Sequence, residues 1–147
     1  MAQLDYFVGT WKCVGTDVAS AGGPEYRIER VITAAKDLDG FWLTMHWEEQ
    51  RTVENPQPWN VEALLTYDAN AHAFHYSFRD NYGMWSTGTT PGWEGNRLVI
   101  VGDYTVDGQT LPYRDVYTRL GERSYEFVTD TMRNGQWSMD AAAQCRK

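Results

Sequence analysis

The sequence has little positive charge and no long apolar run, and both shortages narrow its possible functions. Thirteen Lys and Arg residues against twenty Asp and Glu residues give a net charge of −7. Nucleic-acid binding relies on basic side chains that neutralise phosphate, so an acidic chain is a poor candidate for it. No apolar run approaches the roughly 18 residues that a membrane-spanning helix needs. We therefore expect neither a nucleic-acid partner nor a membrane span.

Cysteine and histidine are also scarce, with two and three copies. Zinc sites gather several such ligands in one place, and here the two cysteines are distant and no histidines cluster, so we expect no metal. The sequence also lacks a Ser-His-Asp spacing, a Gly-rich phosphate loop and a nucleophile elbow. Familiar hydrolase and nucleotide-binding chemistry is therefore not indicated.

Aromatic residues, in contrast, are abundant. They make up 14% of the 147 residues, with seven Trp and nine Tyr. Aromatic side chains favour strands and bury large areas. The length fits one domain, residues 1–147, that is large enough to bury a core without metals or many disulfides.

Apolar and polar residues alternate with a period of two along most of the chain, which is typical of half-buried strands. The predicted strands span residues 8–17, 25–34, 41–53, 60–67, 72–79, 84–90, 96–105, 111–119, 123–132 and 136–146. Turn pairs such as Asp107-Gly108 and Asn134-Gly135 separate them, because these residue types accept positive φ. Segments 54–59 and 91–95, rich in Pro or Gly, are predicted loops.

Short strands and short turns without crossover helices predict an all-β chain, either a sandwich or a closed barrel. Closure removes edge strands, which are an aggregation hazard. We therefore predict a single closed antiparallel up-and-down barrel of about ten strands. Leu4, Phe7 and Val8 fit one helical turn at the N-terminus, which would close one end of the barrel.

The two cysteines lie in the first and last predicted strands, which are neighbours in a closed barrel. Adjacent strands supply the Cα separation of about 4.4–6.8 Å that a disulfide needs. Trp11 shares the parity of Cys13, and Trp137 shares that of Cys145, so we place all four side chains inward. We predict a disulfide and, with it, an oxidising compartment. Two buried free thiols are the alternative.

Several short segments resemble one known group of proteins. They are Phe7-Val8-Gly9-Thr10-Trp11-Lys12-Cys13, Asp39-Gly40-Phe41-Trp42-Leu43, Tyr67-Asp68, Asp80-Asn81-Tyr82-Gly83, Pro91-Gly92-Trp93-Glu94-Gly95 and Cys145-Arg146. Together they span nearly the whole chain. They resemble bacterial lipocalin-like (calycin-type) β-barrels of a domain-of-unknown-function family, many of which are exported.

The resemblance implies a barrel whose closed end is sealed by Trp11 beneath a basic residue near the end of the chain, Arg146 or Lys147. It also implies export, and no known reaction. Haem-binding relatives of the fold use a histidine late in the chain. None of the three histidines here, at positions 46, 72 and 75, lies late in the chain, so we expect no cofactor.

The inward positions of the predicted strands are mostly aromatic, with scattered hydroxyl groups. Such walls suit a flat or elongated apolar ligand held by a few polar contacts. Rings that simply fill the barrel are the alternative, although buried Tyr hydroxyls then need hydrogen-bond partners. The predicted ligand-binding residues are Arg30, Trp47, Phe74, Tyr76, Tyr117, Tyr125 and Trp137.

A few polar residues are candidates for chemistry. Arg30 stands in an apolar stripe, where its guanidinium would suit a ligand carboxylate; the alternatives are a salt bridge to Asp115 or Glu49, or an outward orientation. Asp115 and Tyr117 are catalytic candidates, although an inward Asp near an Arg is more often a structural pair. His46 has outward parity, but a one-residue slip of its strand would turn it inward as a general base.

Three functions remain open on these grounds. The first is a non-enzymatic binding protein for a small hydrophobic or aromatic molecule. The second is a lipocalin-like isomerase or cyclase in which His46, a Tyr or Asp115 moves a proton. The third is a structural or partner-binding exported domain with a filled barrel. We expect a periplasmic or secreted monomer or homodimer whose signal peptide is missing from this sequence, with a cytoplasmic location as the alternative.

Overall fold

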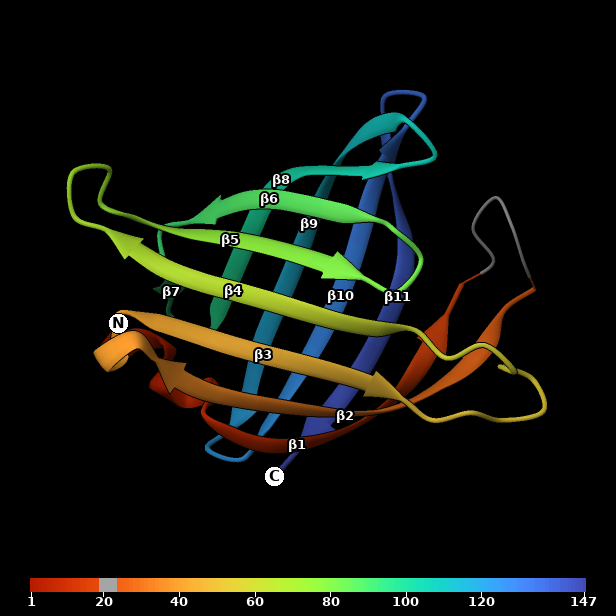
Figure 1. The fold of residues 1–147 in the computed structure, drawn as a ribbon, viewed down its shortest axis with the longest axis horizontal. Helices are drawn as coiled ribbons and strands as arrows, with labels where there is room; N and C mark the ends of the chain where they lie inside the picture. Colours follow the sequence, from red (N-terminus) through yellow and green to blue (C-terminus); the bar gives the residue numbers. More distant parts are fainter. Residues whose placement is uncertain (19–23) are drawn as a thin grey trace.

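The computed structural model describes residues 1–18 and 24–147, and its strands form a closed barrel (Figure 1). Two short 3₁₀ helices are η1 (Ala2–Phe7) and η2 (Leu38–Gly40). The strands are β1 (Gly9–Asp17), β2 (Tyr26–Asp37), β3 (Trp42–Glu49), β4 (Asn60–Asp68), β5 (Ala73–Asp80), β6 (Trp85–Thr90), β7 (Trp93–Glu94), β8 (Arg97–Val106), β9 (Gln109–Gly121), β10 (Ser124–Arg133) and β11 (Gln136–Arg146).

Closure of the sheet confirms the predicted antiparallel barrel. The strands pair in the order β6-β5-β4-β3-β2-β1-β11-β10-β9-β8, and β6 also pairs with β8 to complete the ring. A Cβ at Gly102 would lie 2.0 Å from the Thr87 carbonyl oxygen. Glycine is therefore required where β6 and β8 approach each other at this seam.

Several predicted strand boundaries differ from those in the structure, and local geometry explains two of the differences. The strand predicted over 41–53 ends at Glu49, because Thr52 and Asn55 hydrogen-bond to each other and turn the chain. The predicted loop 91–95 contains the two-residue strand β7, which pairs with β8. Gly92 and Gly95 flank it with φ of 103° and 63°, so the chain turns on both sides of this short extended piece.

The predicted turns at Asp107-Gly108 and Asn134-Gly135 are confirmed. Both residues of each pair have positive φ, at 49° and 74° in the first and 52° and 77° in the second. This is the geometry of the tight hairpin turn whose twist matches that of the strands it joins. The two turns fix the registers of the β8–β9 and β10–β11 hairpins.

The two cysteines form the predicted disulfide. Cys13 on β1 lies directly opposite Cys145 on β11 in the ladder, and the bond joins positions 132 residues apart in sequence. Both side chains are buried with Trp11 in the core, as predicted. The bond therefore ties the first strand to the last from inside the barrel.

The inward orientation predicted for Trp137 is wrong. Its side chain is 38% exposed, and its ring packs on the Arg114 guanidinium, with Arg114 Cζ 4.6 Å from the ring centroid. The register between β10 and β11 shifts so that Asp140 is an extra residue on β11. Such a bulge reverses the in–out alternation, so Trp137 and Met139 face outward.

Helix η1 closes one end of the barrel, as the sequence predicts. Leu4 and Phe7 are buried in the core, and the Trp11 indole N–H donates a 2.7 Å hydrogen bond to the Phe7 carbonyl oxygen. That bond joins the helix to the first strand. The N-terminus and η1 lie together at one end in Figure 1, opposite the loop between β3 and β4.

The cation that covers Trp11 is Lys147 rather than Arg146. The Lys147 ammonium nitrogen lies 4.5 Å from the Trp11 ring centroid and donates to the Tyr6 carbonyl oxygen. Arg146 is exposed. The reason is alternation: Cys145 points inward, so its neighbour Arg146 points outward and the last residue folds back over the barrel end.

Candidate functional site

A cavity of about 500 Å³ opens at the barrel end opposite η1. Loop residues such as Asn55 and Gln57, between β3 and β4, form part of its rim together with Tyr82 and Met84. Aromatic side chains are the largest group among its lining residues. The aromatic lining residues are Tyr26, Trp47, Trp59, Tyr76, Phe78, Tyr82, Tyr104, Tyr113 and Phe127.

Arg30 on β2 lines this cavity, and its positive charge is already paired with a carboxylate. Its Nη2 donates a 2.8 Å hydrogen bond to Glu49 Oε1, and both side chains are almost fully buried. The Arg30 Cζ atom also lies 5.4 Å from the ring centroid of Trp47 and 5.3 Å from that of Trp59. Of the two ion pairs that the sequence left open, the structure has the one with Glu49.

Glu49 also fastens the rim of the cavity. Its Oε2 accepts hydrogen bonds from the Asn55 side-chain amide at 2.9 Å and from the Trp59 backbone N–H at 3.1 Å. The Tyr26 hydroxyl donates to the same oxygen at 3.3 Å. One buried carboxylate at the end of β3 therefore positions both Arg30 and the loop that forms part of the rim.

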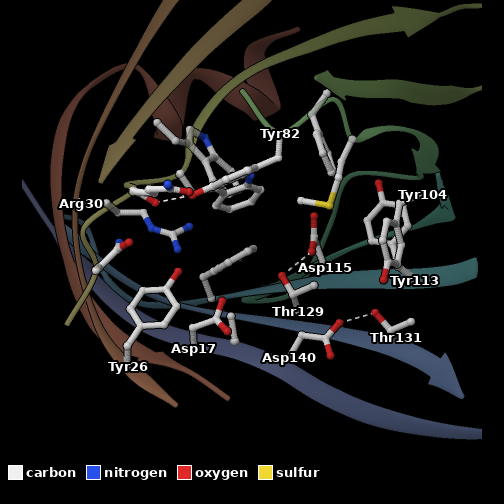
Figure 2. A pocket seen from close by; sticks show the side chains of 18 of the residues that line it. Asp17, Tyr26, Arg30, Tyr82, Tyr104, Tyr113, Asp115, Thr129, Thr131 and Asp140 are labelled. Carbon is white, nitrogen blue, oxygen red and sulfur yellow. Dashed lines mark hydrogen bonds between the residues drawn. The ribbon is translucent and has the colours of Figure 1, made fainter. Parts of the chain in front are cut away.

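Asp115 on β9 places a carboxyl group in the cavity (Figure 2). Only 3% of the residue is exposed, and its Oδ1 accepts a 2.7 Å hydrogen bond from the Thr129 hydroxyl. Burial raises the pKa of Asp115 to about 7, although the Thr129 hydrogen bond and the Arg30 charge act to lower it. A carboxyl group with a pKa near 7 exchanges protons readily at neutral pH.

Three further acidic residues, Asp17, Glu54 and Asp140, line the same space. Burial raises the pKa of Asp17 at the end of β1 to about 6, with a further contribution from the Glu49 charge. Asp140, at the bulge of β11, is paired with Arg133 at 2.5 Å and accepts from the Thr131 hydroxyl. Asp140 is thus neutralised locally, whereas Asp17 has no cation within ion-pair distance among the described residues.

Phenol groups complete the polar part of the lining. The Tyr113 hydroxyl lies 3.2 Å from the Ser86 hydroxyl, which gives it one partner. The buried Tyr76 hydroxyl has no hydrogen-bond partner within residues 1–18 and 24–147. Burial raises the pKa of both phenols above the ordinary value of 10, so they stay protonated and donate hydrogen bonds.

The structure separates the predicted ligand-binding residues into two groups. Arg30, Trp47 and Tyr76 line the cavity. Phe74, Tyr117 and Tyr125 are buried but belong to the packed core, where the Tyr125 ring centroid lies 4.7 Å from that of Trp11. Exposed Trp137 lies outside both groups.

The catalytic candidates also separate. Asp115 lines the cavity, whereas Tyr117 packs on Phe127 with ring centroids 5.1 Å apart. His46 is exposed, which confirms its outward parity. The slipped register of its strand is wrong, because the neighbouring positions Met45 and Trp47 are the buried ones.

Sequence reasoning missed Asp17 and Trp59 as lining residues. Asp17 shares the parity of Trp11 and Cys13, so the alternation along β1 was sufficient to identify it. Trp59 comes at the end of a proline-containing loop, where no periodicity applies. Its position depends on the bond from its backbone N–H to Glu49, which no local pattern signals.

Within the described ranges there is no group of three or more His, Cys, Asp or Glu side chains arranged to hold a metal ion. In the same part of the chain, no helix has the length and apolar character needed to cross a membrane.

Comparisons with known proteins support the fold and leave the function open. No curated protein matches the sequence significantly. The crystal structure of Rv2717c from M. tuberculosis has a similar fold, with a TM-score of 0.73 over 100% of this chain and 98% of that chain, at 10% sequence identity. Residues 2–147 match the model of a family described as "Protein of unknown function (DUF1579)", and the chain therefore belongs to that family.

Proposed function

We propose that this protein binds a small hydrophobic or aromatic molecule in the cavity at the open end of its barrel. The observation that carries the proposal is the cavity itself, about 500 Å³ with walls of aromatic side chains. Sites for small molecules typically measure about 300–1,000 Å³ and combine apolar walls with a few polar groups. Arg30, Asp115 and Tyr76 supply such polar groups here.

The cavity favours ligand binding over a barrel filled by its own side chains. Rings at the open end contact one another edge to face, as Trp47 and Trp59 do with centroids 5.9 Å apart, yet they leave room for a ligand. The buried Tyr76 hydroxyl supports the same conclusion, because an unpaired buried hydroxyl costs free energy that a ligand acceptor would recover.

The disulfide supports a periplasmic or secreted protein. Disulfides persist mainly in oxidising compartments. The Cys13–Cys145 bond joins the first strand of the barrel to the last. A binding protein in such a compartment meets ligands from outside the cytoplasm. Protein isolated from its natural host would carry the bond intact, and two alkylatable thiols would contradict this location.

Binding can be tested with the neutral fluorophore N-phenylnaphthylamine, whose emission rises in apolar surroundings. Ala141 lines the cavity and its neighbour Ala142 does not. We expect saturable binding to the wild-type protein and to Ala142→Phe, and none to Ala141→Phe, because the added ring fills the cavity. If Ala141→Phe does not fold, Met84→Trp replaces it in the test, because the larger side chain narrows the opening of the cavity. Absence of saturable binding to the wild-type protein would contradict the proposal.

A proton-transferring enzyme is a second candidate, and Asp115 is the observation that favours it. Its carboxyl group lies inside the cavity with a pKa of about 7, which suits a general acid or base near neutral pH. The test is to incubate a ligand recovered from native protein with wild-type protein and with Asp115→Asn. Conversion by the wild-type protein alone would support catalysis, and recovery of unchanged ligand from both would contradict it.

A further inference from the structure

The charges around the cavity indicate which kind of ligand it takes. We propose that the preferred occupant is a hydrophobic or aromatic amine whose ammonium group binds the Asp115 carboxylate. This inference rests on the proposed function and names the ligand class for the same site. It is carried by the balance of charges, by the free carboxylate oxygen of Asp115 and by the aromatic walls.

Both cations of the lining are already paired. Arg30 is 2.8 Å from Glu49, and Arg133 is 2.5 Å from Asp140. Among the described residues, Asp115 has no cation within 4.0 Å. The cavity therefore has an excess of negative charge, and a cationic ligand would neutralise it. A ligand anion, in contrast, would find the Arg30 charge compensated and would be repelled by Asp115.

Asp115 is placed to accept a hydrogen bond from a ligand. Its Oδ1 accepts from Thr129, while its Oδ2 has no donor within residues 1–18 and 24–147. Figure 2 shows the carboxylate directed into the space that the lining side chains surround. An ammonium group has three N–H donors. One of them would reach Asp115, which lines the cavity.

The aromatic walls favour the same ligand class. Ring faces attract cations, and the attraction is strongest where water is excluded. The cavity already uses this interaction internally, because Arg30 lies over the rings of Trp47 and Trp59. The remaining rings offer both an apolar surface for the body of an amine and ring faces for its charged end.

Three probes with one ring system separate charge from shape. Tryptamine, tryptophol and indolepropionate carry an ammonium, a hydroxyl and a carboxylate group on similar chains. Calorimetric titration at pH 8, where Asp115 is ionised and the amine is charged, should show tryptamine binding at least about 30-fold more tightly than tryptophol. This factor corresponds to the lower end of the cost of losing one partner of a buried charge pair.

Two variants assign the preference to one carboxylate. Asp115→Asn keeps the shape and removes the charge, so the preference for tryptamine should disappear while tryptophol still binds. Asp17→Asn removes another lining carboxylate that has no ion pair among the described residues and should leave the preference within a few-fold of the wild-type value. Loss of the preference in Asp17→Asn alone would overturn the assignment to Asp115.

The outcomes distinguish this inference from the proposed function. Equal binding of tryptamine and tryptophol, or tighter binding of indolepropionate, would overturn the amine preference and leave the binding function intact. Failure of all three probes, together with failure of the fluorophore, would overturn both.

A pH series on the wild-type protein provides a second measurement that does not depend on a folded variant. Below pH 7 the preference for tryptamine should fall as Asp115 takes up a proton, by up to about tenfold per pH unit. A preference that does not change between pH 8 and pH 5 would overturn the role of Asp115. The charged and titratable groups that influence Asp115 are Arg30, Asp130, Tyr76, Tyr113 and Tyr117. Of these, the three phenols stay protonated over this range, because burial raises their pKa values above the ordinary value of 10.

Discussion

Both ends of the barrel contain aromatic rings and cations, but one end is packed and the other contains a cavity. At the closed end, Arg119 Cζ lies 3.7 Å from the ring centroid of Trp93 and 4.3 Å from that of Tyr6. The Tyr6 hydroxyl donates to the carbonyl oxygens of Gly121 and Ser124. Rings, cations and backbone groups at this end pack against one another, although the Arg119 Nε and the Tyr125 hydroxyl are buried without a hydrogen-bond partner among the described residues.

At the open end the same kinds of group surround a cavity. Arg30 is paired through Nη2 alone, and its Nε and Nη1, like the Tyr76 hydroxyl, have no hydrogen-bond partner among the described residues. The Asp115 carboxylate accepts one bond, from Thr129. The difference comes from what covers each end. Helix η1 and Lys147 plug the closed end, whereas a loop fastened by Glu49 forms part of the rim of the open end. Both ends contain buried polar groups without partners, so the cavity itself marks the end where we expect a ligand.

The disulfide joins the strands that both ends share, so its loss should have the largest effect. The double variant Cys13→Ala/Cys145→Ala removes a bond that spans 132 residues. Chain entropy predicts a loss of up to about 5 kcal/mol in the free energy of unfolding. Urea denaturation of oxidised and variant protein measures it. Equal midpoints would show that the bond adds nothing to either end.

Truncating one ring at each end compares the packed end with the hollow one. Trp11→Ala should lower the free energy of unfolding by about 3–5 kcal/mol, because Trp11 is fully buried and its removal opens a cavity in a packed core. Phe78→Ala should cost about 1 kcal/mol, because Phe78 is half-buried and already borders empty space. Equal losses in chemical denaturation would contradict the contrast between the ends.

Asp115→Asn should stabilise the unliganded protein at alkaline pH. The pKa of Asp115 is raised from 3.8 to about 7 on folding, so the folded state binds its proton more tightly. The stability of the wild-type protein therefore falls as pH rises from about 4 to 7 and loses nothing further above 7 through this group. Ionisation of Asp115 therefore lowers the free energy of unfolding by about 4 kcal/mol in total, at about 1.4 kcal/mol for each unit by which the pKa is raised.

Burying the Asn amide has its own cost, about 1–3 kcal/mol. We therefore expect the free energy of unfolding of Asp115→Asn to be about 1–3 kcal/mol higher than that of the wild-type protein at pH 8. Near pH 4 this difference should vanish or reverse. Thermal or urea unfolding of both proteins at several pH values measures how this difference in stability changes with pH. A difference that does not vary with pH would contradict the raised pKa.

The smallest effect concerns the cation over Trp11. Lys147→Met should lower the free energy of unfolding by about 0.5–1 kcal/mol, the usual value for an exposed cation over an aromatic ring. Arg146→Met is the matched control, because Arg146 is exposed one residue away, and it should change stability by less than about 0.5 kcal/mol. A larger loss in the Arg146 variant would reverse the assignment of the closing residue.

The sequence predicts the barrel, its turns and its disulfide because these depend on local signals. Two-residue alternation marks the strands, and pairs such as Asn134-Gly135 fix the hairpins. Cys13 and Cys145 need only the knowledge that first and last strands meet in a closed barrel. The same reasoning reaches Arg30 and Asp115 as inward polar residues, since each shares the parity of its apolar neighbours.

What the sequence does not predict depends on contacts across strands. The Asp140 bulge reverses the face of Trp137, and no turn residue or break in the pattern marks it. Whether Arg30 pairs with Glu49 or with Asp115 depends on the β2–β3 register, in which Arg30 lies directly opposite Glu49. Alternation names the side chains that face inward, but only the packed structure distinguishes a filled end from a hollow one.

The indole N–H groups provide the most direct test of the contrast between the two ends. Trp47 and Trp59 line the cavity, whereas Trp11 and Trp93 belong to the closed end. Their resonances can be assigned with single Trp→Phe variants in two-dimensional NMR spectra of isotope-labelled protein. On addition of unlabelled tryptophol, we expect the Trp47 and Trp59 signals to shift in a saturable manner while those of Trp11 and Trp93 stay in place. Shifts confined to Trp11 and Trp93, or none at any of the four, would contradict a ligand site at the open end.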